Sequence, residues 1–228
     1  MIDVEGTITK KLAVVIPAFN EASTITSVVQ QANQLAFTIV VDDGSTDDTG
    51  DLARKHAALV VSHPTNRGYD TSLATGLCFA RNLGFSYVVT IDADGQHSPL
   101  HLQEFYTLFE SGADLIVGYR NHCQRWSEAV FCFFGKLVWG IRDPLCGMKG
   151  YRLNLLSKIG KLNTYESIGT ELALRLVSDG IRFHQVKIET LQRIGESRFG
   201  GGFRANLRIM RALWTGLARS KIFRSRLR

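Results

Sequence analysis

Short apolar runs rich in Val and Ile recur along the first half of the chain, separated by segments long enough to form amphipathic helices. The runs are LAVVI, FTIVV, ALVVS, YVVTI and DLIVG, which begin at positions 12, 37, 58, 87 and 114. Strands that alternate with helices in this way form parallel sheets joined by crossover helices. The sequence therefore predicts an α/β fold, with a Rossmann-like, mostly parallel sheet and helices on both of its faces.

Capping and turn residues mark where these helices begin and end. We expect helices over residues 22–34, 48–56, 69–83 and 99–111. Asp47 and Ser98 are candidate N-caps, and Gly84 and Gly112 are candidate stops. Beyond residue 120 the pattern changes to an aromatic-rich segment, a turn within 143–152, a helix near 167–178 and a strand near 182–190.

The chain carries a net charge of +6 that is unevenly distributed over its 228 residues. Residues 203–228 contain eight Lys or Arg and no Asp or Glu, which leaves residues 1–202 at −2. We therefore expect one catalytic domain over 1–202 and a basic tail over 203–228. The tail indicates contact with an anionic partner, whereas the body has no nucleic-acid footprint.

The basic tail has the pattern of an amphipathic helix. Its apolar stripe consists of Phe203, Leu207, Met210, Trp214 and Leu217, and its basic stripe consists of Arg204, Arg208, Arg211 and Arg219. Helices of this kind lie in the headgroup plane of a membrane. The alternative is that the apolar stripe packs on the protein core and the arginines are only solvated.

Cysteine spacing and hydropathy favour a cytoplasmic protein without a membrane span. Cys78, Cys123, Cys132 and Cys146 lack C-x-x-C spacing, so we expect reduced thiols. The most hydrophobic run, 129–141, includes Lys136 and is shorter than the roughly twenty apolar residues that a spanning helix needs.

Acidic residues directly follow three of the predicted strands, in PAFNE (17–21), DDGSTDDT (42–49) and DADGQH (92–97). Ligands of open parallel sheets bind outside the carboxyl ends of the strands. Mg²⁺ or Mn²⁺ would offset the mutual repulsion of these acids, with Asp94 and either Gln96 or Asp92 as protein ligands and phosphate oxygens as the others. The alternative, which we favour for Asp47 alone, is that the acids of 42–49 cap a helix and shape a turn.

Neither G-x-G-x-x-G after the first strand nor G-x-x-x-x-G-K-[ST] occurs, which argues against dinucleotide and P-loop chemistry. Phe19 could instead lie against a base or ribose, while Glu21 accepts hydrogen bonds. His97 and His101 have the i, i+4 spacing of a metal pair but lack an H-E-x-x-H context, so we expect surface or loop residues.

The ordered set PAFNE, VVDDGSTDDT, DADGQH, DPLCGMKGY and GESR, spread over roughly 12–200, resembles glycosyltransferase family 2. The similarity is greatest to its dolichol- or polyprenyl-phosphate mannosyltransferases. The resemblance implies a GT-A fold and an inverting transfer. It assigns nucleoside binding to Pro17, Phe19, Glu21, Val41 and Asp43. The donor diphosphate and its metal are assigned to Asp92, Ala93, Asp94 and Gln96, of which Asp94 and Gln96 are the metal ligands. Arg120 is assigned contacts with phosphate.

The resemblance also places Ser197 and Arg198 of GESR in a loop that closes over the donor, although Arg198 stands where the family usually has lysine. The two cations bind phosphate with different geometry. A further departure is Gln192, which stands where the family carries an arginine.

The acceptor class depends on the need for a catalytic base. A sugar hydroxyl must lose a proton as it attacks, whereas a lipid phosphate is already ionised. Relatives that act on saccharides often carry a pair of acids, but residues 169–172 read GTEL with Glu171 as the single acid. This favours a phosphate acceptor, while Glu171 as a base keeps a hydroxyl acceptor open.

We therefore expect hexose transfer from a GDP-mannose or UDP-glucose type of donor to polyprenyl or dolichyl phosphate, with Asp94, Arg120 and Glu171 in the reaction. The alternatives are a glycan, lipid or protein hydroxyl as acceptor, or a non-catalytic nucleotide-binding adaptor at the membrane. The enzyme would be peripheral on the cytoplasmic membrane face, and a membrane-protein partner stays an open alternative. Segment 126–139 would be either an interfacial lip for the lipid or a core helix.

Overall fold

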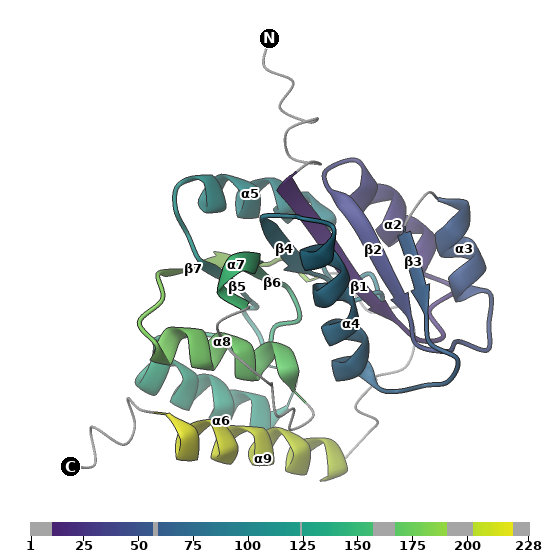
Figure 1. Cartoon of the computed structure of the whole chain (residues 1–228). Helices are drawn as coiled ribbons and strands as arrows, with labels where there is room; N and C mark the ends of the chain where they lie inside the picture. Colours follow the sequence, from purple (N-terminus) through teal and green to yellow (C-terminus); the bar gives the residue numbers. More distant parts are fainter. Residues whose placement is uncertain (1–10, 57–58, 124, 157–166, 191–202, 221–228) are drawn as a thin grey trace.

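A seven-stranded sheet forms the centre of the computed structural model, which describes residues 11–56, 59–123, 125–156, 167–190 and 203–220 (Figure 1). The strand order is β3-β2-β1-β4-β6-β5-β7. The strands are β1 Leu12–Ala18, β2 Phe37–Asp42, β3 Leu59–Ser62, β4 Tyr87–Thr90, β5 Leu115–Tyr119, β6 Lys149–Arg152 and β7 Phe183–Lys187. Only β6 runs antiparallel to its neighbours, so the prediction of a mostly parallel sheet is confirmed.

Helices cover both faces of this sheet, as predicted. They are α2 Ile25–Asn33, α3 Thr49–Lys55, α4 Tyr69–Asn82, η1 Pro99–His101, α5 Leu102–Glu110, α6 Trp126–Phe134, η2 Gly135–Trp139, α7 Leu153–Leu156, α8 Ile168–Ser178 and α9 Phe203–Arg219. Alternate residues of β1 point to opposite faces, so Val14 packs with the core under α2 and α5, and Val15 packs with the core under α4 and α8. Strand β1 therefore contributes side chains to both cores.

Strand β6 was not predicted, because its sequence KGYR contains no apolar run. Pairing on both sides holds it in place: Lys149 pairs with Thr90 of β4, and Tyr151 pairs with Leu115 of β5. The fully buried ring of Tyr151 packs into the core beneath α4 and α8. Long-range pairing thus makes a strand of a segment that looked like a turn.

The predicted helix ends are close to those in the structure. Gly84 and Gly112 follow helices with φ angles of +82° and +98°, which favour glycine. Ser98 Oγ accepts the N–H of Leu100 and caps η1. Asp47 lies one residue before the N-cap of α3, yet its carboxylate still accepts the N–H of Thr49 at 3.1 Å.

Helix α9 divides its apolar residues between two faces. Ala205, Ile209, Leu213 and Leu217 are buried, whereas Phe203, Leu207 and Trp214 are exposed. Helix α6 lies beside α9 (Figure 1) and has exposed side chains of its own. They are Trp126, Phe133 and Leu137, the last of these in the adjoining η2. Core packing therefore accounts for one side of α9, and exposed apolar side chains remain on both α6 and α9. None of the described helices is long and apolar enough to cross a bilayer.

Candidate active site

Strands β2, β1 and β4 are direct neighbours and run parallel, so their carboxyl ends meet at one edge of the sheet. Pro17 pairs with Val41 there, and the segments that follow carry Glu21, Asp43 and Asp94 in buried positions. Phe19 stays 42% exposed. The structure thus brings the predicted nucleoside and metal residues of the three motifs to one edge.

Asp94 and Gln96 share a tight turn at the end of β4. Gly95 has a φ of +73°, and this conformation lets the backbone N–H of Gln96 donate to Asp94 Oδ1 at 3.1 Å. Asp94 is buried, and Gln96 is half-buried. A buried carboxylate beside an amide is the hard oxygen set that Mg²⁺ or Mn²⁺ prefers.

A metal at this turn would need further oxygen ligands. Within the described residues, no group of three or more His, Cys, Asp or Glu side chains is arranged to hold an ion. One carboxylate and one amide would leave room for phosphate oxygens and water, so these two side chains suit a cation that takes part of its coordination from a diphosphate.

Asp92 is fixed from two sides. The hydroxyl of Tyr69, the first residue of α4, donates to Asp92 Oδ1 at 3.0 Å. Gly147 lies against the other oxygen, so closely that a Cβ there would be 2.3 Å from Oδ2. The carboxylate consequently has little freedom to move.

Asp43 holds the segment that follows β3. Its carboxylate accepts the N–H groups of Arg67 at 3.0 Å and Gly68 at 2.8 Å, and His63 Nδ1 lies 2.7 Å from Oδ1. Burial opposes ionisation, but the hydrogen bonds from His63 and the backbone outweigh it and lower the pKa of Asp43. Asp43 therefore orders the edge of the cleft, and its contact with a nucleoside stays a prediction.

Arg120 is paired with two acids that sequence analysis did not single out. Its Nε lies 2.7 Å from Asp143 Oδ2, and its Nη2 lies 3.5 Å from Glu128 Oε2. Burial disfavours the charge of Arg120, but Asp143 outweighs burial and raises the pKa. Glu128 also pairs with Arg125 at 3.3 Å. The predicted phosphate ligand is thus part of a charge-balanced group of two arginines and two acids.

His97 follows Gln96 in the same loop, in agreement with the expected surface or loop position, but its side chain is buried and not at the surface. Burial lowers the pKa of His97, although the charges of Asp92 and Asp94 act to raise it. The neutral ring is therefore favoured. Its Nε2 lies 3.9 Å from Cys146 Sγ, and its Nδ1 has no hydrogen-bond partner among the described residues. His101 is half-buried, and its Nδ1 lies 3.9 Å from Glu104 Oε2.

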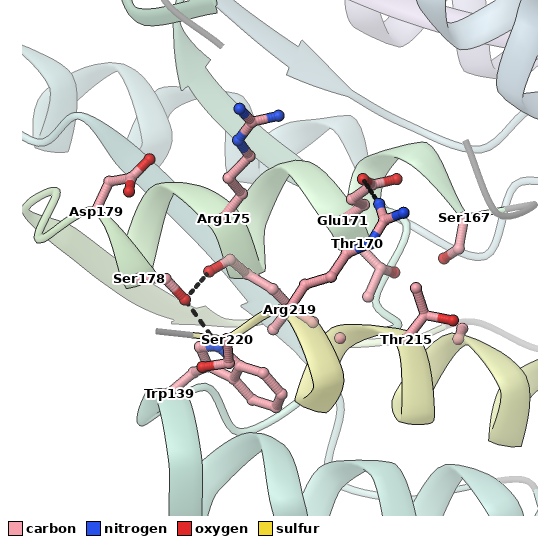
Figure 2. Close-up of a pocket in the computed structure, with 13 residues that line it drawn as sticks. Trp139, Ser167, Thr170, Glu171, Arg175, Ser178, Asp179, Thr215, Arg219 and Ser220 are labelled. Carbon is pink, nitrogen blue, oxygen red and sulfur yellow. Dashed lines mark hydrogen bonds and ion pairs between the residues drawn. The ribbon is translucent and has the colours of Figure 1, made fainter. Parts of the chain in front are cut away.

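Glu171 lines a separate cavity of about 300 Å³ between α8 and α9 (Figure 2). Its Oε1 lies 3.3 Å from Arg219 Nη1, while its Oε2 is buried without a hydrogen-bond partner in the described part of the chain. Burial raises the pKa of Glu171 above its ordinary 4.5. The remaining cavity wall includes Trp139, Leu174 and Ala212.

The amino end of α8 connects this cavity with the strand-end acids. The N–H of Ile168 donates to Asp70 Oδ1 at 2.8 Å, and the neighbouring Tyr69 donates to Asp92. Glu171 lies three residues further along α8 and pairs with Arg219 of α9. Ser197 and Arg198 lie outside the described residues, as does Gln192.

Comparison with known proteins agrees with this arrangement. The family model described as glycosyl transferase family 2 matches residues 13–127, which include all three strand-end motifs. The chain belongs to glycosyltransferase family 2. The polyprenol monophosphomannose synthase of Mycolicibacterium smegmatis is 29% identical over 219 residues, covering 85% of this chain and 82% of the relative. The undecaprenyl-phosphate mannosyltransferase of Micrococcus luteus is 27% identical over 242 residues, covering 95% and 99%.

Similarity to solved structures confirms the GT-A fold. Glucosyl-3-phosphoglycerate synthase of Mycobacterium tuberculosis, crystallised with Mn²⁺, UDP and glucosyl-3-phosphoglycerate, superimposes with a TM-score of 0.77. The alignment covers 96% of this chain and 83% of the synthase at 21% identity, so the likeness concerns the fold alone. The family model and the relatives, by contrast, confirm the resemblance of the sequence motifs to family 2.

Proposed function

We propose that this family 2 glycosyltransferase moves a hexose from a nucleotide sugar, of the GDP-mannose or UDP-glucose type, to polyprenyl or dolichyl phosphate with inversion. The observation that carries the proposal is the buried Asp94 beside Gln96, at the edge where the three strand-end motifs meet. The names of the relatives from M. smegmatis and M. luteus support the lipid phosphate as acceptor.

On the donor side, Pro17, Phe19, Glu21, Val41 and Asp43 would hold the nucleoside. The exposed ring of Phe19 suits stacking against a base or ribose. Asp94 and Gln96, with Asp92 and Ala93 beside them, would hold Mg²⁺ or Mn²⁺. The ion would supply positive charge for the leaving diphosphate. Ser197 and Arg198 remain proposed donor residues.

On the acceptor side, an ionised lipid phosphate would attack the anomeric carbon in one displacement, for which the chain needs no base. Arg120 would orient phosphate from within its group of paired charges. One observation favours a hydroxyl acceptor as the second candidate: the buried Glu171 Oε2, in a carboxyl of raised pKa, would be a stronger base than an ordinary glutamate.

We propose that the exposed surface over α6 and α9 rests on the lipid surface. Its large apolar side chains are Trp126, Phe133, Leu137, Phe203, Leu207 and Trp214. Arg208 and Arg211 are exposed on α9 and would face anionic headgroups. Residues 1–202 would then be the catalytic domain, which contributes α6 to the lipid-facing surface, and 203–228 the basic tail. The protein would lie on the cytoplasmic face, with a membrane-protein partner as an open alternative.

A radiolabelled transfer assay tests the proposal, with GDP-mannose and UDP-glucose as donors and polyprenyl phosphate or a saccharide as acceptors. We expect product on the lipid phosphate that requires Mg²⁺ or Mn²⁺ and is lost in Asp94→Asn. Asp51→Asn, which changes an exposed acid paired with Arg54, is the matched control and should keep activity. Product on the saccharide and none on the lipid phosphate would reject the proposed acceptor.

Glu171→Gln separates the two acceptor classes. Transfer to a phosphate should stay within roughly twofold of the unmodified enzyme, whereas loss of a general base should lower transfer to a hydroxyl by about 10²- to 10⁴-fold. The measurement is kcat/KM for each acceptor at neutral pH.

A further inference from the structure

Two of the four cysteines lie close together, although they are nine positions apart in the sequence. Cys123 follows β5 in the turn that leads to α6, and Cys132 lies near the end of α6. Their sulfur atoms are 3.7 Å apart, and both residues are free thiols in the structure. A disulfide bond needs about 2 Å between the sulfurs, so the two would have to approach by about 1.7 Å. Residues 121–123 are in neither a helix nor a strand, so no helical or sheet hydrogen bond opposes this approach from the side of Cys123.

The two thiols differ in their access to solvent. Cys123 is exposed, whereas Cys132 is half-buried, with its Sγ 3.9 Å from Asp143 Oδ1. Burial and the nearby charge of Asp143 raise the pKa of Cys132. Thiol exchange requires both a thiolate and access to the reagent. A bulky reagent in solution should therefore react with Cys123 first, and Cys132 should react only through Cys123.

The cysteine pair adjoins the charged group around Arg120. Asp143 Oδ1, beside Cys132, also accepts a hydrogen bond from Arg120 Nη2 at 3.2 Å. Glu128, one turn before Cys132 on α6, pairs with Arg120 and with Arg125. A bond between the two sulfurs would therefore link the turn that follows Arg120 to the helix whose acid pairs with it.

We propose that Cys123 and Cys132 are a redox modification site, at which exchange with a small-molecule disulfide such as oxidised glutathione forms an intramolecular disulfide and fastens the turn after β5 to α6. The Cys123 thiolate attacks one sulfur of oxidised glutathione and releases one glutathione thiolate. The sulfur of Cys132 then attacks that of Cys123, the bond from Cys123 to glutathione breaks, and the second glutathione leaves with the proton of Cys132. The protein thus loses two hydrogens, and oxidised glutathione becomes two molecules of the reduced form. In a reducing compartment both cysteines stay thiols, and the site responds when disulfides accumulate.

Peptide mass spectrometry tests this on the full chain, after equilibration with mixtures of reduced and oxidised glutathione and alkylation of the remaining thiols. We expect the peptides of Cys123 and Cys132 to be joined and lighter by two hydrogens. Cys78 is an internal control, because it is also exposed but its sulfur contacts Arg81 and Asn82, so it should stay free or keep a glutathione. Cys132→Ala should leave glutathione on Cys123, and Cys78→Ala should leave the bond between Cys123 and Cys132 intact.

A glutathione that persists on Cys123 of the unmodified protein, without a bond to Cys132, would overturn the proposal. So would a disulfide that joins two molecules, or two unmodified thiols under conditions in which Cys78 carries glutathione. The cross-linked protein should melt roughly 3–10 °C above its reduced form, because the bond closes a short loop of the unfolded chain. The oxidised Cys132→Ala protein should show no such rise. A cross-linked protein that melts at or below the temperature of its reduced form would refute the fastening of the turn.

Discussion

Replacing Gly147 with alanine tests whether the position of Asp92 matters for donor chemistry. The new Cβ would lie 2.3 Å from Asp92 Oδ2 and 2.8 Å from its Cγ, and real Cβ atoms essentially never approach other atoms within 3.0 Å. Either the carboxylate moves away from Gly147, or β6 shifts away from β4. Overpacking of this size costs about 1–3 kcal/mol of folding free energy.

The effect on activity should exceed the effect on stability. A displacement on the order of 1 Å at a reacting site can lower the rate about 10²-fold, whereas 1–3 kcal/mol would lower the melting temperature of a chain of this size by roughly 2–12 °C. We therefore expect Gly147→Ala to remain folded at 25 °C and to lose about 10- to 100-fold in kcat/KM for the donor. Transfer kinetics and thermal unfolding on the same preparation measure both quantities.

The control is Gly169→Ala in α8, where the added Cβ would meet Leu73 at an ordinary 3.5 Å. Alanine is a better helix former than glycine, so this variant should be equally or more stable and fully active. If Gly147→Ala keeps unmodified kcat/KM, the fixed position of Asp92 has no catalytic consequence, and the reasoning from this contact is wrong.

Further predictions concern stability and membrane contact. Asp43→Asn should lose about 2 kcal/mol of unfolding free energy at neutral pH. Because the pKa of Asp43 is lowered in the folded state, its carboxylate stabilises the fold above the ordinary pKa of 3.8. The loss, measured by urea titration, should therefore shrink as the pH falls below that value. The raised pKa of Glu171 has the opposite sign, so the unmodified protein should lose stability relative to Glu171→Gln as pH rises from 4.5 to neutrality; a constant difference in chemical denaturation would contradict this. Replacing Leu207 and Trp214 together with serine should lower binding to anionic vesicles by roughly tenfold or more in a sedimentation assay. Ala218→Ser on the same helix should not lower vesicle binding. Equal binding by the unmodified protein and both variants would exclude the α9 surface from membrane contact.

The sequence allowed the strands and the strand-end motifs to be predicted. Val14 and Val15 belong to cores on opposite faces, and such doubly buried strands require continuous apolar runs that are visible along the chain. Parallel strands end at one edge, so the positions of Glu21, Asp43 and Asp94 near one another followed from local pattern and sheet geometry. Strand β6 could not be predicted, because its stability comes from neighbours on both sides.

The partners of charged residues could not be predicted for a related reason. Arg120 meets Asp143 across 23 positions of sequence, and Lys149 is buried in β6, which pairs with β4. A lysine or an arginine looks the same in sequence whether it is solvated or enclosed. Likewise, the helical pattern of α9 did not reveal which of its apolar side chains would be buried, because that depends on packing with α6 and with the core that includes α8.

Local sequence thus determined the fold class and the family, because strand periodicity, caps and motif order depend on residues that are near one another in the chain. Only the tertiary structure decided which charges are paired behind the donor motif, where Glu171 lies, and which face of α9 remains exposed. These properties depend on the dielectric and the partners that distant segments supply, and long-range packing alone brings those segments together.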